Sequence, residues 1–303
     1  MAPHKAVVVG ATNGIGKACA LKLAGSGFHV IAVGRDRPGR AEAIIAELNE
    51  NSPDSSQGKH SFYPCDAFSL QDVKKCAEQI VKDHDSIDAA IMTQGMATLQ
   101  SFTPTVDGND EKMTLHYWSR MAFANCLLPS LRKSTVPGSP CVISVLSGGV
   151  HSPYKKYMSD PLLKKNYSIQ NAADCAGYYT DLGFDYMARQ PNNQSIQFIH
   201  AAPGVVNSNW GTEFPWYLRY MVRGMQSVLA KSPKKCAKYM CDPIMKSVSD
   251  TAVTKDKEKG IFIMNQDATE GKLTKAHTNE AMEKVWNVTA EVLQKVGIDI
   301  NKS

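Results

Sequence analysis

The cysteine pattern of this sequence lacks the features that mark zinc sites and disulfide frameworks. Its eight cysteines form no Cys-x-x-Cys pair and do not cluster with histidines. Zinc-binding and disulfide-rich proteins usually show such regular spacings. We therefore expect no metal ion and no disulfides, and the composition favours a reduced, cytoplasmic protein.

Long apolar runs and a strong excess of one charge are also missing. No stretch of about eighteen apolar residues occurs, and the amino-terminal segment has neither a long apolar core nor a cleavage site. A membrane-spanning or secreted protein is therefore not expected. Lysine and arginine (34) exceed aspartate and glutamate (29) by only five, and the basic residues are scattered. This balance argues against a nucleic-acid partner, whereas it suits a phosphorylated ligand.

The sequence does contain a regular alternation of two kinds of segment. Short apolar, β-branched runs alternate with longer amphipathic stretches, which is typical of a parallel sheet covered by helices on both faces. We predict one α/β domain over residues 1–303, with a doubly wound sheet of seven parallel strands. The predicted strands span residues 6–9, 29–33, 61–64, 89–92, 141–145, 196–200 and 261–264. The predicted helices span residues 16–24, 40–49, 70–84, 111–132, 171–190, 233–248 and 279–296.

A glycine-rich loop, "GATNGIG", follows the first predicted strand and leads into a helix. Glycine lets the backbone turn tightly and approach a pyrophosphate, and the helix N-terminus offers free N–H groups and a partial positive charge. This placement predicts a nucleotide site rather than an ordinary turn. The residues expected to contact the nucleotide are Gly10, Thr12, Asn13, Gly14, Ile15 and Gly16.

The end of the second predicted strand, "AVGRDRPGR", bears on the choice of cofactor. At this position an acidic residue binds a free ribose 2′-hydroxyl, whereas an arginine accommodates a 2′-phosphate. Arg35 follows Gly34 directly, and a guanidinium can grip phosphate with two hydrogen bonds. The sequence therefore predicts NADP, with NAD as the alternative. Asp36 could instead pair with the neighbouring arginines on a solvated loop.

The sequence resembles the short-chain dehydrogenase/reductase superfamily over nearly the whole chain. Four stretches carry the resemblance in the first hundred residues. They are "VVGATNGIG", "VGRD", the "CD" pair at residues 65–66 and "IDAAIMTQG" at residues 87–95. The resemblance implies a Rossmann-type fold and an NAD(P)-dependent oxidoreductase. It also implies that Asp66 caps the adenine and that a "PG" segment lines the nicotinamide. The residues of that segment are Pro203, Gly204, Val206 and Ser208, the last standing where threonine is usual. In the turn after the fourth strand, "MTQG", only Gly95 matches the family's residues.

Two further stretches, residues 111–131 and 260–286, are more loosely similar to retinol-dehydrogenase-like enzymes and fungal metabolic reductases. This similarity implies an apolar small-molecule substrate. Residues 211–230, "GTEFPWYLRYMVRGMQSVLA", break the alternation of strands and helices. We predict that they form a lid over the substrate, and the alternative is contact with a membrane surface.

The catalytic residues implied by the resemblance are only partly present. The family's serine falls on Ser147, and its asparagine falls on His116, which could relay protons or serve a structural role. The family's tyrosine and lysine fall on Ala173 and Gly177. None of the eleven tyrosines has a lysine four residues later, so realignment does not restore the pair.

Three hypotheses for the proton donor follow. Tyr167 could donate from the loop before the helix, or Tyr178 or Tyr179 could donate from within it. In the third hypothesis the chain binds NADP(H) but has lost ordinary carbonyl reduction, and it acts as a sensor, a scaffold or a catalyst of a different step. We predict an oxidoreductase with Ser147 and Tyr167 as catalytic residues, and keep the pseudoenzyme as the alternative.

Overall fold

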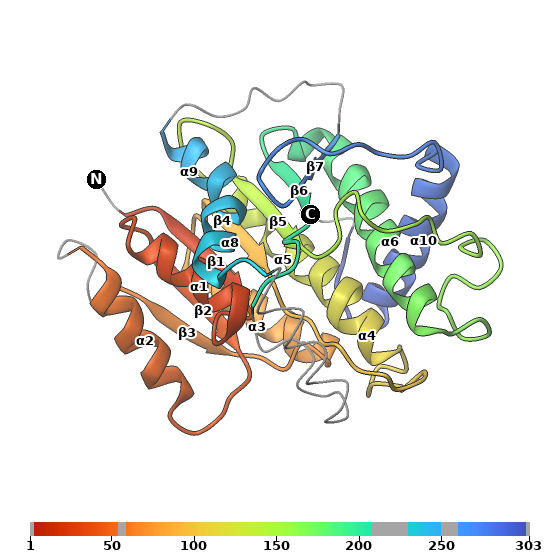
Figure 1. The fold of residues 1–303 in the computed structure, drawn as a ribbon, viewed down its shortest axis with the longest axis horizontal. Coiled ribbons are helices and arrows are strands. Elements are labelled where there is room, and N and C mark those ends of the chain that lie inside the picture. Colours follow the sequence, from red (N-terminus) through yellow and green to blue (C-terminus); the bar gives the residue numbers. More distant parts are fainter. Residues whose placement is uncertain (1–2, 54–58, 208–229, 250–259, 301–303) are drawn as a thin grey trace.

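The computed structural model describes residues 3–53, 59–207, 230–249 and 260–300 (Figure 1). Except for Ala230, the predicted lid at residues 211–230 lies outside the described residues, as does Ser208. No helix in the described part of the chain is long and apolar enough to cross a membrane.

Seven parallel strands form one sheet in the order β3-β2-β1-β4-β5-β6-β7, which confirms the predicted fold class (Figure 1). The chain reverses direction across the sheet between β1 and β4, and in such folds ligands bind in the crevice at that point. The strands are β1 (Lys5–Val9), β2 (His29–Gly34), β3 (Ser61–Pro64), β4 (Ala89–Met92), β5 (Cys141–Val145), β6 (Gln197–Ala201) and β7 (Ile261–Met264).

The central strands are apolar throughout because helices cover both of their faces. Every residue of β4 and β5 is buried. Parallel strands covered on both sides show such continuous apolar runs rather than alternation. This explains why short β-branched segments predicted the strands to within a residue or two.

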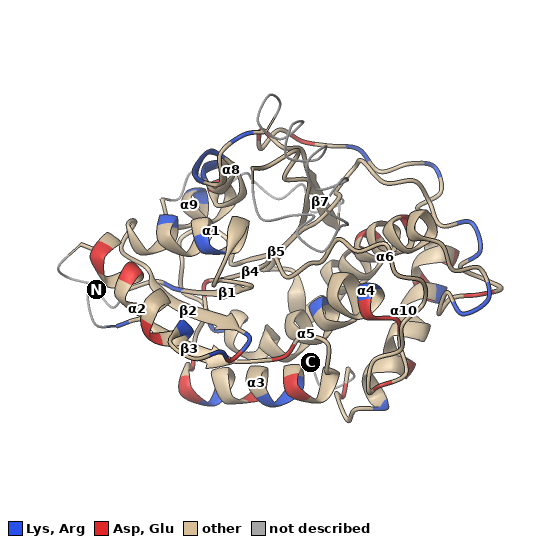
Figure 2. Ribbon diagram, turned by 60° about the horizontal axis from the view of Figure 1, so that its bottom comes forward, with Lys and Arg blue, Asp and Glu red and all other residues tan. Residues whose placement is uncertain are grey.

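The helices divide between the two faces of the sheet (Figure 2). Helices α1, α2, α8 and α9 pack on one face, and α3, α5 and α6 pack on the other, where α10 lies against α6. The bounds are α1 (Gly14–Ala24), α2 (Arg40–Asn51), α3 (Leu70–Asp83), α4 (Glu111–Met113), α5 (Ser119–Leu131), α6 (Ile169–Arg189), α8 (Pro233–Met240), α9 (Asp242–Val248) and α10 (Asn279–Gln294).

Two predicted helices differ from those observed. The helix predicted over residues 233–248 is two helices, α8 and α9, because Pro243 has no N–H to continue the hydrogen-bond ladder past Cys241. The helix predicted over residues 111–132 contains a π-helical turn, Thr114–Trp118, between α4 and α5. Such turns often occur at functional sites.

Candidate functional site

The glycine-rich loop packs so closely that side chains are excluded from two of its positions. Gly10 has a φ of +84°, and a Cβ there would lie 2.7 Å from Thr93 Oγ1. A Cβ on Gly16 would lie 2.2 Å from the carbonyl oxygen of Gly10. The start of α1 is therefore held against the end of β1, and Asn13 caps this helix by accepting a hydrogen bond from Gly14 N at 2.8 Å.

A cavity of about 660 Å³ opens at the carboxyl ends of β1, β2, β4 and β5. Its lining includes most of the residues predicted to bind the cofactor. These are Gly10, Thr12, Asn13, Gly14, Ile15, Gly16, Arg35, Asp66, Gly95 and Pro203. The structure thus brings these residues from five separate segments to one cavity, whose position matches the crevice of doubly wound sheets.

The remaining predicted contacts of the "PG" segment lie elsewhere. Val206 is buried in the core between α1, α8 and the sheet. Gly204 is exposed and has a φ of +67°. A Cβ at this position would lie only 1.9 Å from Gln266 Oε1. Among the described residues, neither contributes to the cavity lining.

Basic side chains lie at the end of the cavity beside β2. Arg35 is exposed, Arg40 is half-buried, and both line the cavity. No ion pair joins Asp36 to an arginine in the part of the chain that the structure describes. The alternative in which Asp36 pairs with the neighbouring arginines therefore gains no support. Arg35 and Arg40 line a site that could bind a phosphate group.

His116 lies in the π-helical turn and lines the same cavity. Its Nε2 accepts a hydrogen bond from the N–H of Met96 at 3.1 Å, so the proton of the neutral ring is on Nδ1. Burial, with the nearby charge of Arg120, lowers the pKa of His116 to about 3. The neutral imidazole holds the turn after β4 in place.

Arg120 was not identified from the sequence, although it is the one basic residue of the largely apolar α5. Its side chain is buried and lines the cavity. Nη1 donates to Ser144 Oγ at 2.7 Å and to Val145 O at 2.9 Å, and Nη2 donates to Gln94 O at 2.5 Å. Nε has no partner. Burial lowers the pKa of Arg120 to about 9, so a positive charge remains in the cavity lining near neutral pH.

Ser147 follows β5, and hydrogen bonds to its backbone N–H and carbonyl groups hold it in place. Its N–H donates to His200 Nε2 at 3.1 Å, and its carbonyl oxygen accepts from His151 Nδ1 at 2.9 Å. The hydroxyl oxygen is buried and has no hydrogen-bond partner. A Cβ on Gly177 would lie 2.5 Å from both Ser147 Oγ and His151 Cγ. The position that the family gives to lysine is therefore closed to any side chain here.

The comparison with known proteins decides the family. Residues 4–153 match the family model for short chain dehydrogenases. The chain belongs to the short-chain dehydrogenase/reductase superfamily.

The relatives and solved structures differ in how much of their length they share with this chain. It is 33% identical to Oxidoreductase AN1596 of Emericella nidulans, over 69% of this chain and 61% of that protein. It is 25% identical to the polyprenol dehydrogenase of Homo sapiens, over 77% and 69%. The chain spans about three fifths of the length of the first curated relatives it matches. The NADPH-dependent 3-quinuclidinone reductase of Rhodotorula rubra has the same fold, with a TM-score of 0.59 and 18% identity over 84% and 88%.

The three candidate tyrosines occupy two kinds of environment. Tyr167 has a buried hydroxyl without a hydrogen-bond partner, and its ring packs edge-on against Phe102. Burial and the nearby Asp110 carboxylate raise the pKa of Tyr167 to about 12. Neither Tyr167 nor Ser147 lines the cavity formed by the described residues.

Tyr178 and Tyr179 serve packing. Both are buried in the core. The Tyr178 hydroxyl donates to Ala276 O at 2.6 Å, and the Tyr179 hydroxyl donates to Pro161 O at 3.0 Å. Because both hydroxyls are committed to backbone carbonyls, the structure favours a structural role for them over proton donation.

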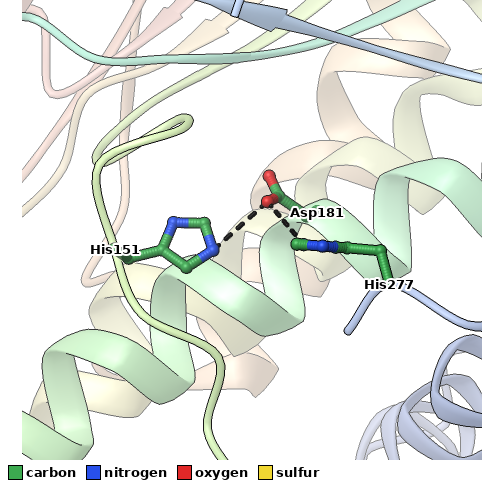
Figure 3. A group of neighbouring side chains, drawn as sticks. All are labelled: His151, Asp181 and His277. Atoms are coloured by element: carbon green, nitrogen blue, oxygen red, sulfur yellow. Dashed lines mark hydrogen bonds and ion pairs between the residues drawn. The ribbon is translucent and has the colours of Figure 1, made fainter. Parts of the chain in front are cut away.

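Asp181 and three histidines form a buried cluster that was not identified from the sequence. His200 Nδ1 lies 2.5 Å from Asp181 Oδ1. His151 Nε2 and His277 Nε2 lie 3.2 and 3.0 Å from Asp181 Oδ2 (Figure 3). The imidazoles and their hydrogen bonds hold the pKa of Asp181 well below its usual value despite burial. The only sequence signal was an acidic residue within the apolar stretch "GYYTDLGF".

Proposed function

We propose that this chain is an NADP(H)-dependent oxidoreductase that transfers hydride to the carbonyl carbon of an apolar small molecule. The observation that carries the proposal is the cavity at the carboxyl ends of the strands. It joins the glycine-rich loop and Arg35 at one end to Val145 and Leu146, directly before Ser147, at the other. This is the extent expected of a dinucleotide site with a reaction centre beyond it.

The preference for NADP rests on the two arginines at the ribose end. Arg35 and Arg40 both line the cavity, and no acidic residue pairs with Arg35 among the described residues. Solved structures of the same fold hold NAD in one case and NADP in another. The fold therefore permits either cofactor, and the guanidinium groups favour the one with a 2′-phosphate.

The cofactor, when bound, supplies the hydride, and the residues of this chain orient the substrate oxygen and supply a proton. Ser147 is suited to hold that oxygen because its hydroxyl is buried and has no other partner. A buried polar group without a partner calls for an explanation, and a substrate oxygen provides one. Tyr167 is the proposed proton donor, and its own hydroxyl is equally unpartnered.

The raised pKa of Tyr167 favours reduction over oxidation. With a pKa of about 12 the phenol keeps its proton near neutral pH and can give it to the oxygen that gains charge during carbonyl reduction. Alcohol oxidation needs the deprotonated form, which is scarce at that pKa. We therefore propose that the chain acts as a reductase.

An apolar substrate is supported by the cavity wall and by one relative. Met96, Leu115 and Leu146 line the cavity. The human polyprenol dehydrogenase, whose name gives a lipid alcohol as its substrate, is similar over 77% of this chain. We extend this preference to the present chain as a proposal.

The test is NADPH oxidation by purified protein with a panel of apolar aldehydes, ketones and quinones. We expect at least one compound to be reduced, and the Ser147→Ala variant to lose that activity while still binding NADPH. If NADPH binds tightly but no compound is reduced, the pseudoenzyme hypothesis replaces this proposal.

A further inference from the structure

Three side chains that the proposed hydride transfer does not use meet beside Ser147, and we infer that they bind a divalent transition-metal ion such as Zn²⁺. They are His151, Asp181 and His277. Among the described residues, they are the group of histidine, cysteine and acidic side chains placed to share one ion, with their ligand atoms within 4.8 Å of one another. Figure 3 shows the two imidazoles approaching the carboxylate from two sides.

The distances between ligand atoms suit a zinc ion. His151 Nε2 and His277 Nε2 lie 3.2 and 3.0 Å from Asp181 Oδ2. Atoms bound to one tetrahedral zinc ion at about 2.0–2.1 Å lie about 3.3–3.4 Å apart. The two Nε2 atoms lie within 4.8 Å of each other, so side-chain movements that even out the three distances would complete the spacing of a tetrahedral site. Three protein ligands leave the fourth tetrahedral position to water.

The contacts on the far side of each ligand match those that orient metal ligands in proteins. His151 Nδ1 donates to the carbonyl oxygen of Ser147 at 2.9 Å. His277 Nδ1 lies 3.1 Å from both the carbonyl oxygen and the backbone nitrogen of Thr274, so it donates in one tautomer and accepts in the other. Binding of a metal ion at His277 Nε2 requires the tautomer in which Nδ1 donates. Metal-binding histidines usually donate their second N–H to such an acceptor. Asp181 keeps a hydrogen bond from His200 on Oδ1, which leaves Oδ2 to face the two Nε2 atoms.

The nature of the ligands selects the class of ion. Two imidazoles and one carboxylate suit Zn²⁺ and its neighbours in the first transition row. Mg²⁺ and Ca²⁺ prefer sites made of oxygen atoms and are not expected here. The side chains of His151, Asp181 and His277 are only 4%, 2% and 4% exposed.

The ion would join three segments that are distant in the sequence. His151 follows β5, Asp181 lies in the middle of α6, and His277 precedes α10 (Figure 3). His151 also bonds the carbonyl oxygen of Ser147, and His200 bonds its N–H. The ion therefore acts as a positioning element that fixes the backbone of Ser147.

Metal binding is tested on the full chain without any substrate. Protein treated with EDTA and dialysed is titrated with ZnCl₂ in a calorimeter, and the same experiment is repeated with MgCl₂. We expect one Zn²⁺ per chain, no Mg²⁺ binding, and a melting temperature that rises with Zn²⁺ concentration. Co²⁺ in place of Zn²⁺ should give the visible absorption of a tetrahedral site.

Variants assign the binding to this cluster. His151→Gln and His277→Gln should each weaken Zn²⁺ binding by more than about 100-fold. Loss of a residue that only hydrogen-bonds to a metal ligand typically costs roughly 10- to 100-fold, and loss of a ligand should cost more. His4→Gln is the matched control, because His4 also lies near a carboxylate, 3.4 Å from Asp88, but belongs to no such group. If His277→Gln does not fold, His277→Cys keeps a ligand at that position and should retain Zn²⁺.

Two results would overturn the inference. One is the failure of the wild-type chain to bind Zn²⁺ stoichiometrically, which would leave the cluster as a hydrogen-bonded network around Asp181. The other is Zn²⁺ binding of unchanged affinity in both glutamine variants, which would place the ion elsewhere. NADPH binding measured on the same samples reports separately on the proposed function.

Discussion

Asp181 and His200 meet in the interior of the protein with 2.5 Å between Oδ1 and Nδ1, and this contact extends to the candidate reaction centre. The N–H of Ser147 donates to the other nitrogen of His200, so the imidazole proton must lie on Nδ1, toward the carboxylate. Asp181 therefore fixes both the tautomer of His200 and, through it, the backbone of Ser147.

Removing the charge of Asp181 should destabilise the fold. Asp181→Asn leaves three buried imidazoles without their carboxylate, and breaking a buried pair on one side typically costs about 3–5 kcal/mol. Urea unfolding of the variant should show this loss. Asp174→Asn, on the same helix but with exposed contacts to Ser152 and Gln170, is the control and should change stability by less than about 1 kcal/mol. Equal effects of the two substitutions would contradict the role given to the cluster.

Restoring the family's lysine should harm this protein. Because a Cβ at position 177 would lie 2.5 Å from Ser147 Oγ and His151 Cγ, Gly177→Ala should cost about 1–3 kcal/mol, and Gly177→Lys more. The measurement is the thermal unfolding midpoint. Ala173→Ser, at an exposed position on the same helix, is the control. A gain of activity in the Ala173→Tyr, Gly177→Lys double variant would show that the site accepts the family's machinery after all.

Arg35 should decide between the two cofactors. A charge-assisted hydrogen bond to a 2′-phosphate is worth about 1.5–3 kcal/mol, so Arg35→Ala should weaken NADPH binding by roughly 10- to 100-fold and spare NADH. Fluorescence titration with each cofactor measures this. Arg37→Ala is the control, because Arg37 does not line the cavity among the described residues. Equal losses for NADPH and NADH in Arg35→Ala would refute the assignment.

Tyr167→Phe should lower turnover by about 10²-fold or more and leave NADPH affinity nearly unchanged, as loss of a positioned acid does. Steady-state kinetics with a substrate found in the panel, together with cofactor titration, separate the two quantities. Full activity in Tyr167→Phe alongside loss of activity in Ser147→Ala would point to a different donor.

The pKa of about 12 for Tyr167 also predicts different pH dependences for the two reaction directions. Reduction uses the protonated phenol, so its rate should stay level over roughly pH 7 to 10. Oxidation uses the deprotonated phenol, so its rate should rise by about tenfold per pH unit below a pH of about 12. Initial rates in both directions check this, and a reduction rate that falls steeply above neutral pH would contradict the proposed donor.

Local patterns in the sequence determined the sheet and the nucleotide end of the site. Strands such as β4 and β5 are buried on both faces and so appear as short apolar runs. The glycine-rich loop is recognisable for a similar reason, because the crowding at Gly10 and Gly16 excludes every other residue type. The apolar runs and the glycine spacing each lie within a few consecutive residues, so the sequence displays them directly, although the crowding at Gly10 comes from the distant Thr93.

The tertiary structure alone decided what surrounds Ser147. Arg120 joins the ends of β4 and β5, and the Asp181 cluster unites residues from positions 151 to 277. No spacing in the sequence connects these residues, because they come together only when the sheet forms and α6 packs against it. The search for metal-binding patterns among the cysteines could not find this cluster for the same reason. A glycine at position 177 looked like a lost lysine in the sequence, and the structure shows that the space is filled by His151 and Ser147.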